Sequence, residues 1–427
     1  MIKIEIKKIM QKFNINSYDA ALKAISIIKK NKGGTLIFNK GIYSLGYIEL
    51  CSNINIHLNK GAVISPIDDF NLLDKYHREK GYLNRPTWEN CDYDGNPSMF
   101  FLYAKNKKNI KITGSGIING KEKMFYGKVM KDAIEGAFYP RMPLIYFEGC
   151  KNIIIKNITL KKSAFWTIHL VGSKNILIRN IKIRNNIKML NCDGIDPDSS
   201  QNIIIDNADI VSADDSIVIK STKYGNKYGN SKNIYVRNSK LQSTSAAIKI
   251  GTETVGSFNN ITFENIDIHD SNRGISIQSR DCGNINNLLF KNINIDTHRY
   301  NPLMWWGKGE GIAITSVNRY EDTILGKIKN ITFENININS ENGIYINSLN
   351  NIKNINFNNV YLNLNKKTNY NHHLYDLRPY YKINEPIKDN LYLFNSNGVK
   401  KININNFKYD INDNIKKLVK DIYKIIK

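Results

Sequence analysis

Asn175–Ile183 reads NILIRNIKI, and its pattern of Asn-apolar-x-apolar-x-Asn-apolar-x-apolar recurs along the chain. The other copies are Asn152–Leu160 (NIIIKNITL), Asn202–Ile210 (NIIIDNADI), Asn233–Leu241 (NIYVRNSKL), Asn260–Ile268 (NITFENIDI), Asn287–Ile295 (NLLFKNINI), Asn330–Ile338 (NITFENINI) and Asn354–Leu362 (NINFNNVYL). Successive copies start 23, 27, 31, 27, 27, 43 and 24 residues apart. This period is too short for a βαβ unit, which needs about 30 residues or more, and the alternation of apolar residues is typical of strands.

The repeat predicts an all-β fold, a single-stranded parallel β-helix. In this fold the chain makes one coil per repeat, the inward Ile and Val side chains stack along the axis, and each strand pairs with the equivalent strand of the next coil. Asn tolerates the left-handed conformation at the corners and can stack its amide on the Asn of the next coil. The alternative for these Asn residues is compositional bias, but their fixed offset from the apolar positions favours a ladder.

We expect a single domain over residues 1–427. Residues 1–34 form an N-terminal cap with one helix, which Asn16 or Ser17 begins and Gly33-Gly34 ends. Residues 35–410 form the coils. The long intervals between repeats must leave the coil as loops, and these predicted insertions are 66–100, 120–142, 296–310 and 366–385. After the last coil, a Lys-rich helix over residues 412–427 is expected to cap the solenoid.

The composition restricts the classes of partner. Formal net charge is +23, from 61 Lys and Arg against 38 Asp and Glu, but the charge is dispersed rather than gathered in a basic arm. We therefore expect no nucleic-acid partner. The positive charge is explained either by compositional bias alone or by an acidic polysaccharide partner. The Lys and Glu residues near the N-terminus do not fit a signal peptide, and no segment has the about 18 apolar residues that span a membrane. The expected location is cytoplasmic.

The cysteines fit the same location. They are five in number, without a C-x-x-C pair: Cys51, Cys91, Cys150, Cys192 and Cys282. We expect free buried thiols in a reducing compartment.

Superposing the strand before each Asn motif brings carboxylates together. Asp193 and Asp215 fall on neighbouring coils, Asp214 precedes Asp215, and Asp196 lies on the same exposed face. Like charges this close repel, so at least one carboxyl should have a raised pKa. Glycoside hydrolysis uses such a set, with one carboxylic acid protonating the leaving oxygen and another carboxylate activating water. A divalent metal site, or Asp residues that only cap turns, are the alternatives.

These residues resemble a known family. Asn191-Cys192-Asp193-Gly194-Ile195-Asp196 followed by Asp214-Asp215 is similar to glycoside hydrolase family 28, the polygalacturonases and their relatives. Gly33–Phe38, Ile112–Gly120 and Ser163–Leu170 resemble other stretches of the family. The resemblance implies a right-handed β-helix and a pectin-degrading glycosidase that inverts the anomeric carbon. It also implies that Asp214 is the general acid and that Asp193 and Asp215 hold the nucleophilic water, with no cofactor and no metal.

The sequence departs from the family at two places. Ser245-Ala246-Ala247 stands where the family has Gly-His-Gly, and Ser276-Ile277-Gln278 stands where it has Arg-Ile-Lys, the basic pair that grips a galacturonate carboxylate. We therefore predict other substrate-binding residues. They are Asp196, Lys249, Glu253, Arg273, Arg280, Trp305, Trp306 and Arg378. Packing inside the loop is the alternative for each tryptophan, and a salt bridge to Asp376 is the alternative for Arg378.

The predicted function is hydrolysis of a uronic-acid-containing, pectin-type oligo- or polysaccharide, and the long insertions favour exo-action because they can close the ends of a groove. A β-helix polysaccharide lyase or uronate epimerase, which abstracts a proton beside Ca²⁺, is an alternative within enzymes. A non-catalytic carbohydrate-binding β-solenoid is an alternative outside them. The sequence does not indicate the sugar, the linkage or the oligomeric state.

Overall fold

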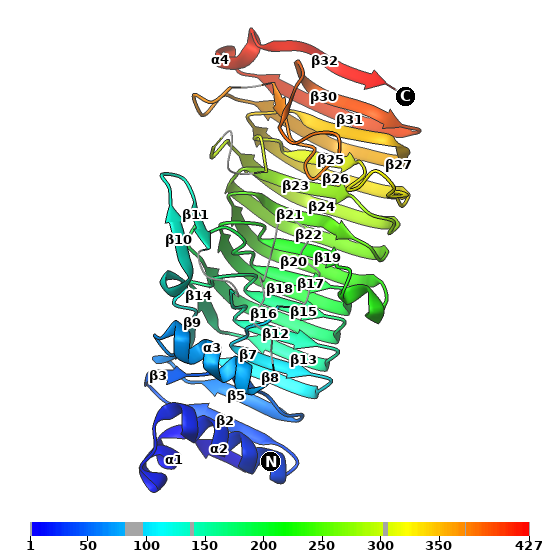
Figure 1. Ribbon diagram of the computed structural model, residues 1–427. Coiled ribbons are helices and arrows are strands. Elements are labelled where there is room, and N and C mark those ends of the chain that lie inside the picture. The colour runs from blue at the N-terminus through cyan, green and yellow to red at the C-terminus, as the bar shows by residue number, and fades with distance from the viewer. Residues whose placement is uncertain (1, 82–96, 137–140, 302–305, 372, 427) are drawn as a thin grey trace.

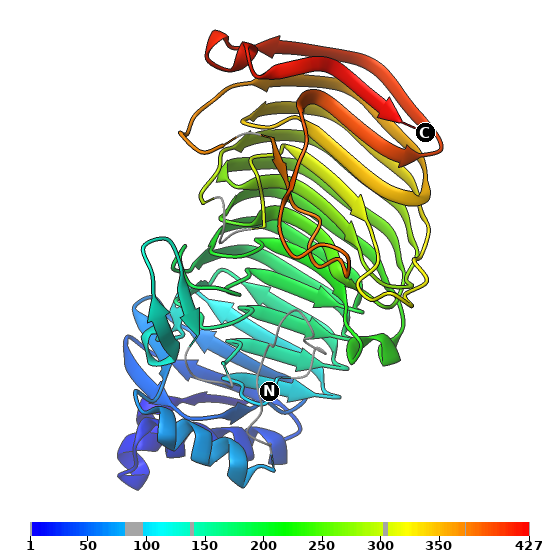
Figure 2. The same ribbon diagram turned by 45° about the horizontal axis from the view of Figure 1, so that its top comes forward.

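The computed structural model describes residues 2–81, 97–136, 141–301, 306–371 and 373–426. Within them the chain winds as a right-handed, single-stranded parallel β-helix, and one sheet of 28 strands follows the whole length of the solenoid (Figures 1 and 2). Strands pair in parallel from coil to coil, as β16 (Lys174–Arg184) does with β18 (Gln201–Ser212). The predicted fold class is confirmed.

The elements have the following bounds. The helices are α1 (Ile6–Phe13), α2 (Ser17–Lys30), α3 (Phe70–Glu79) and α4 (Asp413–Lys416), with the 3-10 turns η1 (Glu122–Phe125) and η2 (Gly225–Tyr228). The strands of the first half are β1 (Ile2–Glu5), β2 (Gly34–Phe38), β3 (Gly41–Leu45), β4 (Ile48–Glu49), β5 (Ile54–Leu58), β6 (Ala62–Pro66), β7 (Leu102–Lys105), β8 (Lys108–Gly114), β9 (Ile117–Asn119), β10 (Tyr126–Val129), β11 (Ile134–Gly136), β12 (Ile145–Glu148), β13 (Lys151–Lys156), β14 (Thr159–Lys161), β15 (Ile168–Val171), β16, β17 (Ile195–Asp198) and β18. Those of the second half are β19 (Ile217–Ser221), β20 (Ser231–Ser243), β21 (Ala246–Thr254), β22 (Phe258–Ser271), β23 (Arg273–Ser279), β24 (Ile285–Thr297), β25 (Ile312–Ser316), β26 (Ile328–Ser340), β27 (Ile344–Leu364), β28 (Leu374–Tyr375), β29 (Ile387–Lys388), β30 (Leu391–Val399), β31 (Ile402–Ile411) and β32 (Val419–Ile426).

The core consists of columns of identical or similar side chains. Ile195, Ile217, Ile248, Ile275 and Ile312 are register partners from coil to coil, and all are fully buried. A second column consists of phenylalanine rings stacked with centroids 4.9 to 5.5 Å apart, and its members are Phe263, Phe290, Phe333 and Phe357. Because every coil buries the same residue types at the same place, the repeat sets the register without help from the loops.

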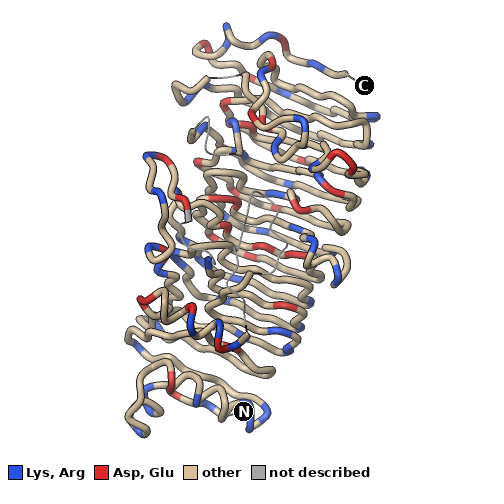
Figure 3. Tube along the Cα trace, in the orientation of Figure 1, with Lys and Arg blue, Asp and Glu red and all other residues tan. Residues whose placement is uncertain are grey.

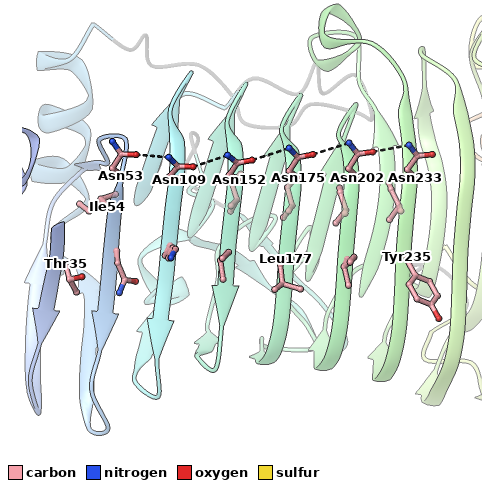
Figure 4. Close-up of a pocket in the computed structure, with 18 of the residues that line it drawn as sticks. Thr35, Asn53, Ile54, Asn109, Asn152, Asn175, Leu177, Asn202, Asn233 and Tyr235 are labelled. Atoms are coloured by element: carbon pink, nitrogen blue, oxygen red, sulfur yellow. Dashed lines mark hydrogen bonds between the residues drawn. The ribbon is translucent and has the colours of Figure 1, made fainter. Parts of the chain in front are cut away.

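The Asn residues at the first position of the repeat form the expected ladder. The side-chain amide of Asn202 donates to Asn175 at 3.1 Å and its oxygen accepts from Asn233 at 3.0 Å, and the contact continues along the row in Figure 4. All three residues have φ between 56° and 58°, in the left-handed region. One residue type therefore serves both as the corner and as the contact between coils.

We expect the Asn202→Ala variant to lower the free energy of unfolding by about 1 to 3 kcal/mol, because it removes two hydrogen bonds and leaves a Cβ at positive φ. Asn202→Gly removes the same hydrogen bonds but accepts the backbone conformation, so its loss should be smaller by about 1 kcal/mol. Denaturant unfolding of both variants measures the difference. Equal losses would show that the left-handed backbone conformation at this corner adds nothing to the loss of stability in the Ala variant.

The two ends differ in how well they were predicted. The expected N-terminal helix is α2, and Asn16 caps it by accepting from the backbone N–H of Asp19 at 2.9 Å. The structure adds β1 and α1 before it. At the other end the predicted helix over 412–427 is wrong. Only Asp413–Lys416 is helical, and β32 pairs with β30 instead, which gives the exposed backbone groups of that edge hydrogen-bond partners.

The predicted insertions lie where the coil is interrupted, and three of them carry secondary structure. Residues 66–100 include α3, residues 120–142 include the antiparallel pair β10 and β11, and residues 366–385 include β28, which pairs with β29. Figure 1 shows β10 and β11 projecting from the side of the solenoid. The insertion at 296–310 is described only in part, since residues 302–305 lie outside the described residues.

The positions of the basic residues in the structure agree with the expected dispersed charge. Lys and Arg residues occur along the whole length of the solenoid in Figure 3. Three cysteines are buried as free thiols, Cys51, Cys150 and Cys192, whereas Cys282 is exposed, contrary to the expectation; Cys91 lies outside the described residues. None of the helices in the described part of the chain combines the length and the apolar composition that a bilayer span requires.

Candidate active site

Two adjacent coils bring the predicted catalytic carboxylates to one outer face. Asp193 precedes β17, and the Asp214-Asp215 pair precedes β19. The backbone N–H of Gly194 donates to the carbonyl of Asp215 at 2.9 Å, which places the two segments on adjacent coils. A Cβ at Gly194 would lie 2.4 Å from the carbonyl oxygen of Ser216, so this close approach requires glycine.

A small cavity of about 40 Å³ lies at this face. Its lining comes from four coils and two insertions, and its members are Trp166, Asn191, Asp193, Asp214, Asp215, Lys220, Lys249, Thr252, Glu253, Trp306 and Pro379. All three predicted catalytic residues are in this set. So are three of the predicted substrate-binding residues, Lys249, Glu253 and Trp306.

Two lysines hold the carboxylates together. The Lys249 ammonium lies 2.7 Å from Oδ2 of Asp215, whose Oδ1 accepts from the backbone N–H of Ala246 at 3.1 Å. The Lys220 ammonium lies 3.5 Å from Asp193, 3.7 Å from Asp196 and 3.4 Å from Glu253. It also lies 3.8 Å from the centre of the Trp166 ring. Buried carboxylates need such partners, because an unpaired buried charge is costly.

Burial and mutual repulsion change the acidity of these groups. Burial, followed by the negative charge of Asp215, raises the pKa of Asp214 to about 6, although Lys249 and Lys220 act in the opposite direction. Burial raises the pKa of both Asp193 and Asp196 well above the usual carboxyl range, and the charges of Asp196 and Asp214 add to the effect on Asp193. Asp214 can therefore hold a proton in mildly acidic solution, whereas Asp215 has an ammonium partner.

Of the remaining predicted substrate-binding residues, those that the structure describes are not among the lining residues. Asp196 is fully buried on β17, beneath Lys220. Arg273 donates two hydrogen bonds to Glu310, and Arg280 is buried, where it donates to the carbonyls of Ser279, Thr315 and Leu377. Arg378 forms the salt bridge to Asp376 that the alternative interpretation named, and its guanidinium lies 4.9 Å from the Trp306 ring centre. Trp305 lies outside the described residues.

Sequence reasoning missed Lys220, Trp166 and Thr252. A signal for Lys220 was present: it lies two residues beyond the outward-facing Val218 on β19, so the period of two directs its side chain to the same face. Its register partner is Asp198. Asp198 is fully buried and accepts from the backbone N–H and the hydroxyl of Thr222.

Other features of the described surface are less suited to chemistry. A groove of about 1100 Å³ runs along the Asn ladder, but none of its described lining residues is a carboxylate (Figure 4). Among the described residues, no group of three or more His, Cys, Asp or Glu side chains is arranged to hold a metal ion. The carboxylate cavity is therefore the candidate site.

The fold and the site together define a β-helix protein with an acidic cavity on one outer face. A sequence model described as "Glycosyl hydrolases family 28" matches residues 89–303, half of the chain, and the chain belongs to this family. It is 28% identical over 257 residues to a "Probable polygalacturonase" of Vitis vinifera, a match that covers 58% of this chain and 50% of that protein. The chain thus spans about half the length of that relative.

Two solved structures share the fold. The exopolygalacturonase of Thermotoga maritima superposes with a TM-score of 0.67 at 20% identity, over 95% of this chain and 92% of that one. The family 28 exopolygalacturonase of Yersinia enterocolitica gives a TM-score of 0.65 at 14% identity, over 96% of this chain and 78% of that one.

Proposed function

We propose that the protein is a glycoside hydrolase that cleaves a uronic-acid-containing, pectin-type oligo- or polysaccharide with inversion at the anomeric carbon. The observation that carries the proposal is the meeting of Asp193, Asp214 and Asp215 at one cavity, with a pKa of about 6 for Asp214. Asp214 donates a proton to the leaving oxygen. Asp193 and Asp215 hold the attacking water, and Asp215, with Lys249 as its partner, accepts the water proton. The polygalacturonase relatives support a pectin-type substrate.

Exo-action is part of the proposal, because residues of two insertions form part of the cavity wall and a column of buried side chains flanks the cavity. The outward column that carries Asp196 continues toward the N-terminus as His169, Tyr146 and Tyr103, which are register partners and buried. On the other side Trp306 and Pro379 come from the insertions at 296–310 and 366–385. A site bounded by insertions in this way favours attack at a chain end.

The test is a screen of polygalacturonan, rhamnogalacturonan and short uronic oligosaccharides, with the first-formed anomer read by ¹H NMR. We expect reducing ends of inverted configuration and release of the smallest product from the start of the reaction. Retention of configuration would exclude the inverting mechanism. An unsaturated, ultraviolet-absorbing product would indicate a lyase, and a rapid fall in the viscosity of the polymer would contradict exo-action.

The pH dependence of kcat/KM provides a separate prediction. Because Asp214 must be protonated to act as the acid, kcat/KM should fall about tenfold per pH unit above an apparent pKa of about 6. Lys249→Met should move this limb to higher pH, since the ammonium lowers the pKa of Asp214. A profile that stays flat to pH 8 would contradict the assignment.

A further inference from the structure

The described residues that line the cavity carry no excess of positive charge. Four carboxylates, Asp193, Asp214, Asp215 and Glu253, face two ammonium groups, Lys220 and Lys249. The described lining residues include no arginine and no histidine. Even when Asp214 and Asp193, whose pKa values are raised, hold protons, the two ammonium groups do not outnumber the ionised carboxylates. A bound sugar therefore meets no excess of positive charge among the described lining residues.

Both ammonium groups already have carboxylate partners. Lys249 lies 2.7 Å from Asp215, and Lys220 lies within 3.7 Å of three carboxylates. The nearby arginines cannot substitute for them from their present positions, because Arg273 is paired with Glu310 and Arg378 with Asp376. A substrate carboxylate placed here would be an additional anion beside cations that are already neutralised.

Among the described lining residues, Glu253 is the one carboxylate that the acid and water roles do not use. It lies on β21 with 11% of its side chain exposed, where Oε1 accepts from the Thr252 hydroxyl at 2.9 Å and Oε2 lies 3.4 Å from Lys220. Burial alone would raise the pKa of Glu253, but the charges of Lys220, Arg319 and Lys249 outweigh burial and lower it to about 2. Its oxygens can accept hydrogen bonds from sugar hydroxyls and repel a carboxylate.

We propose that the sugar unit bound in this cavity is neutral, and that Glu253 selects it by accepting hydrogen bonds from its hydroxyls and by repelling a uronate. The uronic acids of the chain then lie outside the cavity. Trp306, which is only partly buried in the cavity wall, offers an aromatic surface to the apolar face of such a unit. This inference rests on the proposed function and names the substrate class of the same site.

The test compares two rhamnogalacturonan oligosaccharides of equal length, one with a neutral rhamnosyl unit at the non-reducing end and one with a uronosyl unit. Calorimetric titration of the Asp214→Asn protein should show the neutral-ended oligosaccharide bound at least about tenfold more tightly. Adding Glu253→Gln, which removes only the charge, should narrow this ratio to within about threefold. The matched control, Glu321→Gln at an exposed position outside the lining, should leave the ratio unchanged.

Equal or tighter binding of the uronosyl-ended oligosaccharide by the parent Asp214→Asn protein would overturn the inference, and this comparison does not depend on how the Glu253 variant folds. An unchanged ratio in a folded Glu253→Gln protein would also overturn it. Hydrolysis by the unmodified enzyme separates the two proposals. Turnover with the opposite preference leaves the proposed function standing, whereas the predicted binding preference without turnover of either compound removes the function and leaves the cavity assignment. Failure to bind or to cleave either compound overturns both.

Discussion

The Asp214→Asn enzyme is expected to lose about 10²- to 10⁴-fold in kcat while KM changes little, because Asn keeps the shape of the side chain but cannot supply the proton for the leaving oxygen. Initial rates and single-turnover rates on the best substrate of the screen measure the loss. Asp267→Asn, an exposed change of the same type on β22, is the matched control and should leave kcat unaltered.

The loss should not come from unfolding. The folded-state pKa of Asp214, about 6, lies above its ordinary value of 3.8, so the folded protein binds the proton more tightly than the unfolded chain. The free energy of unfolding therefore falls as pH rises from about 4 to about 6. Above that range the ionised, buried Asp214 lowers it by a constant amount. Asn removes the penalty, so the variant should be at least as stable as the unmodified protein at pH 7 in a thermal melt. Turnover within about tenfold of the original would instead show that Asp214 is not the acid.

The repeated elements were predictable because their determinants are local and recur. The inward Ile columns set the register, so Ala246 pairs with Arg273 and Lys249 with Ser276 on the next coil. The C-terminal segment was not predictable in the same way. The apolar residues of Leu418–Ile426 suit a helix face as well as a strand, and this segment lacks the Asn residues that mark the other coils.

The site was predicted only in part, for a similar reason. The carboxylates lie on the coils, so stacking the repeats placed them correctly. Arg280 illustrates the rest: its guanidinium donates to the carbonyl of Leu377, in an insertion whose position the repeat does not determine. Lys220 faces the site by the period of two, but its contact with three carboxylates depends on how far its long side chain reaches, which no pattern of residue types specifies.

The Lys220→Met variant should have the largest effect on folding. Met retains most of the apolar stem but removes the ammonium from among Asp193, Asp196 and Glu253, which leaves buried carboxylates without their cation. Breaking a buried ion pair in this way costs about 3 to 5 kcal/mol. Denaturant unfolding at pH 7 should show a loss of this size, whereas Lys232→Met, at an exposed position on β20, should change stability by less than about 0.5 kcal/mol.

The pH dependence of that loss separates charge from packing. In the unmodified protein Glu253 has a folded-state pKa of about 2 against an ordinary 4.5, with Lys220 the foremost of the charges that lower it. A depressed carboxyl pKa contributes stability that is fully present above about pH 4.5 and is lost as pH falls toward 2. Lys220→Met lacks much of this contribution, so the gap between the two proteins should be wide at pH 7 and narrower at about pH 3.5. Equal gaps at both pH values would mean that the lysine stabilises the site through its stem and its contact with Trp166 rather than through its charge.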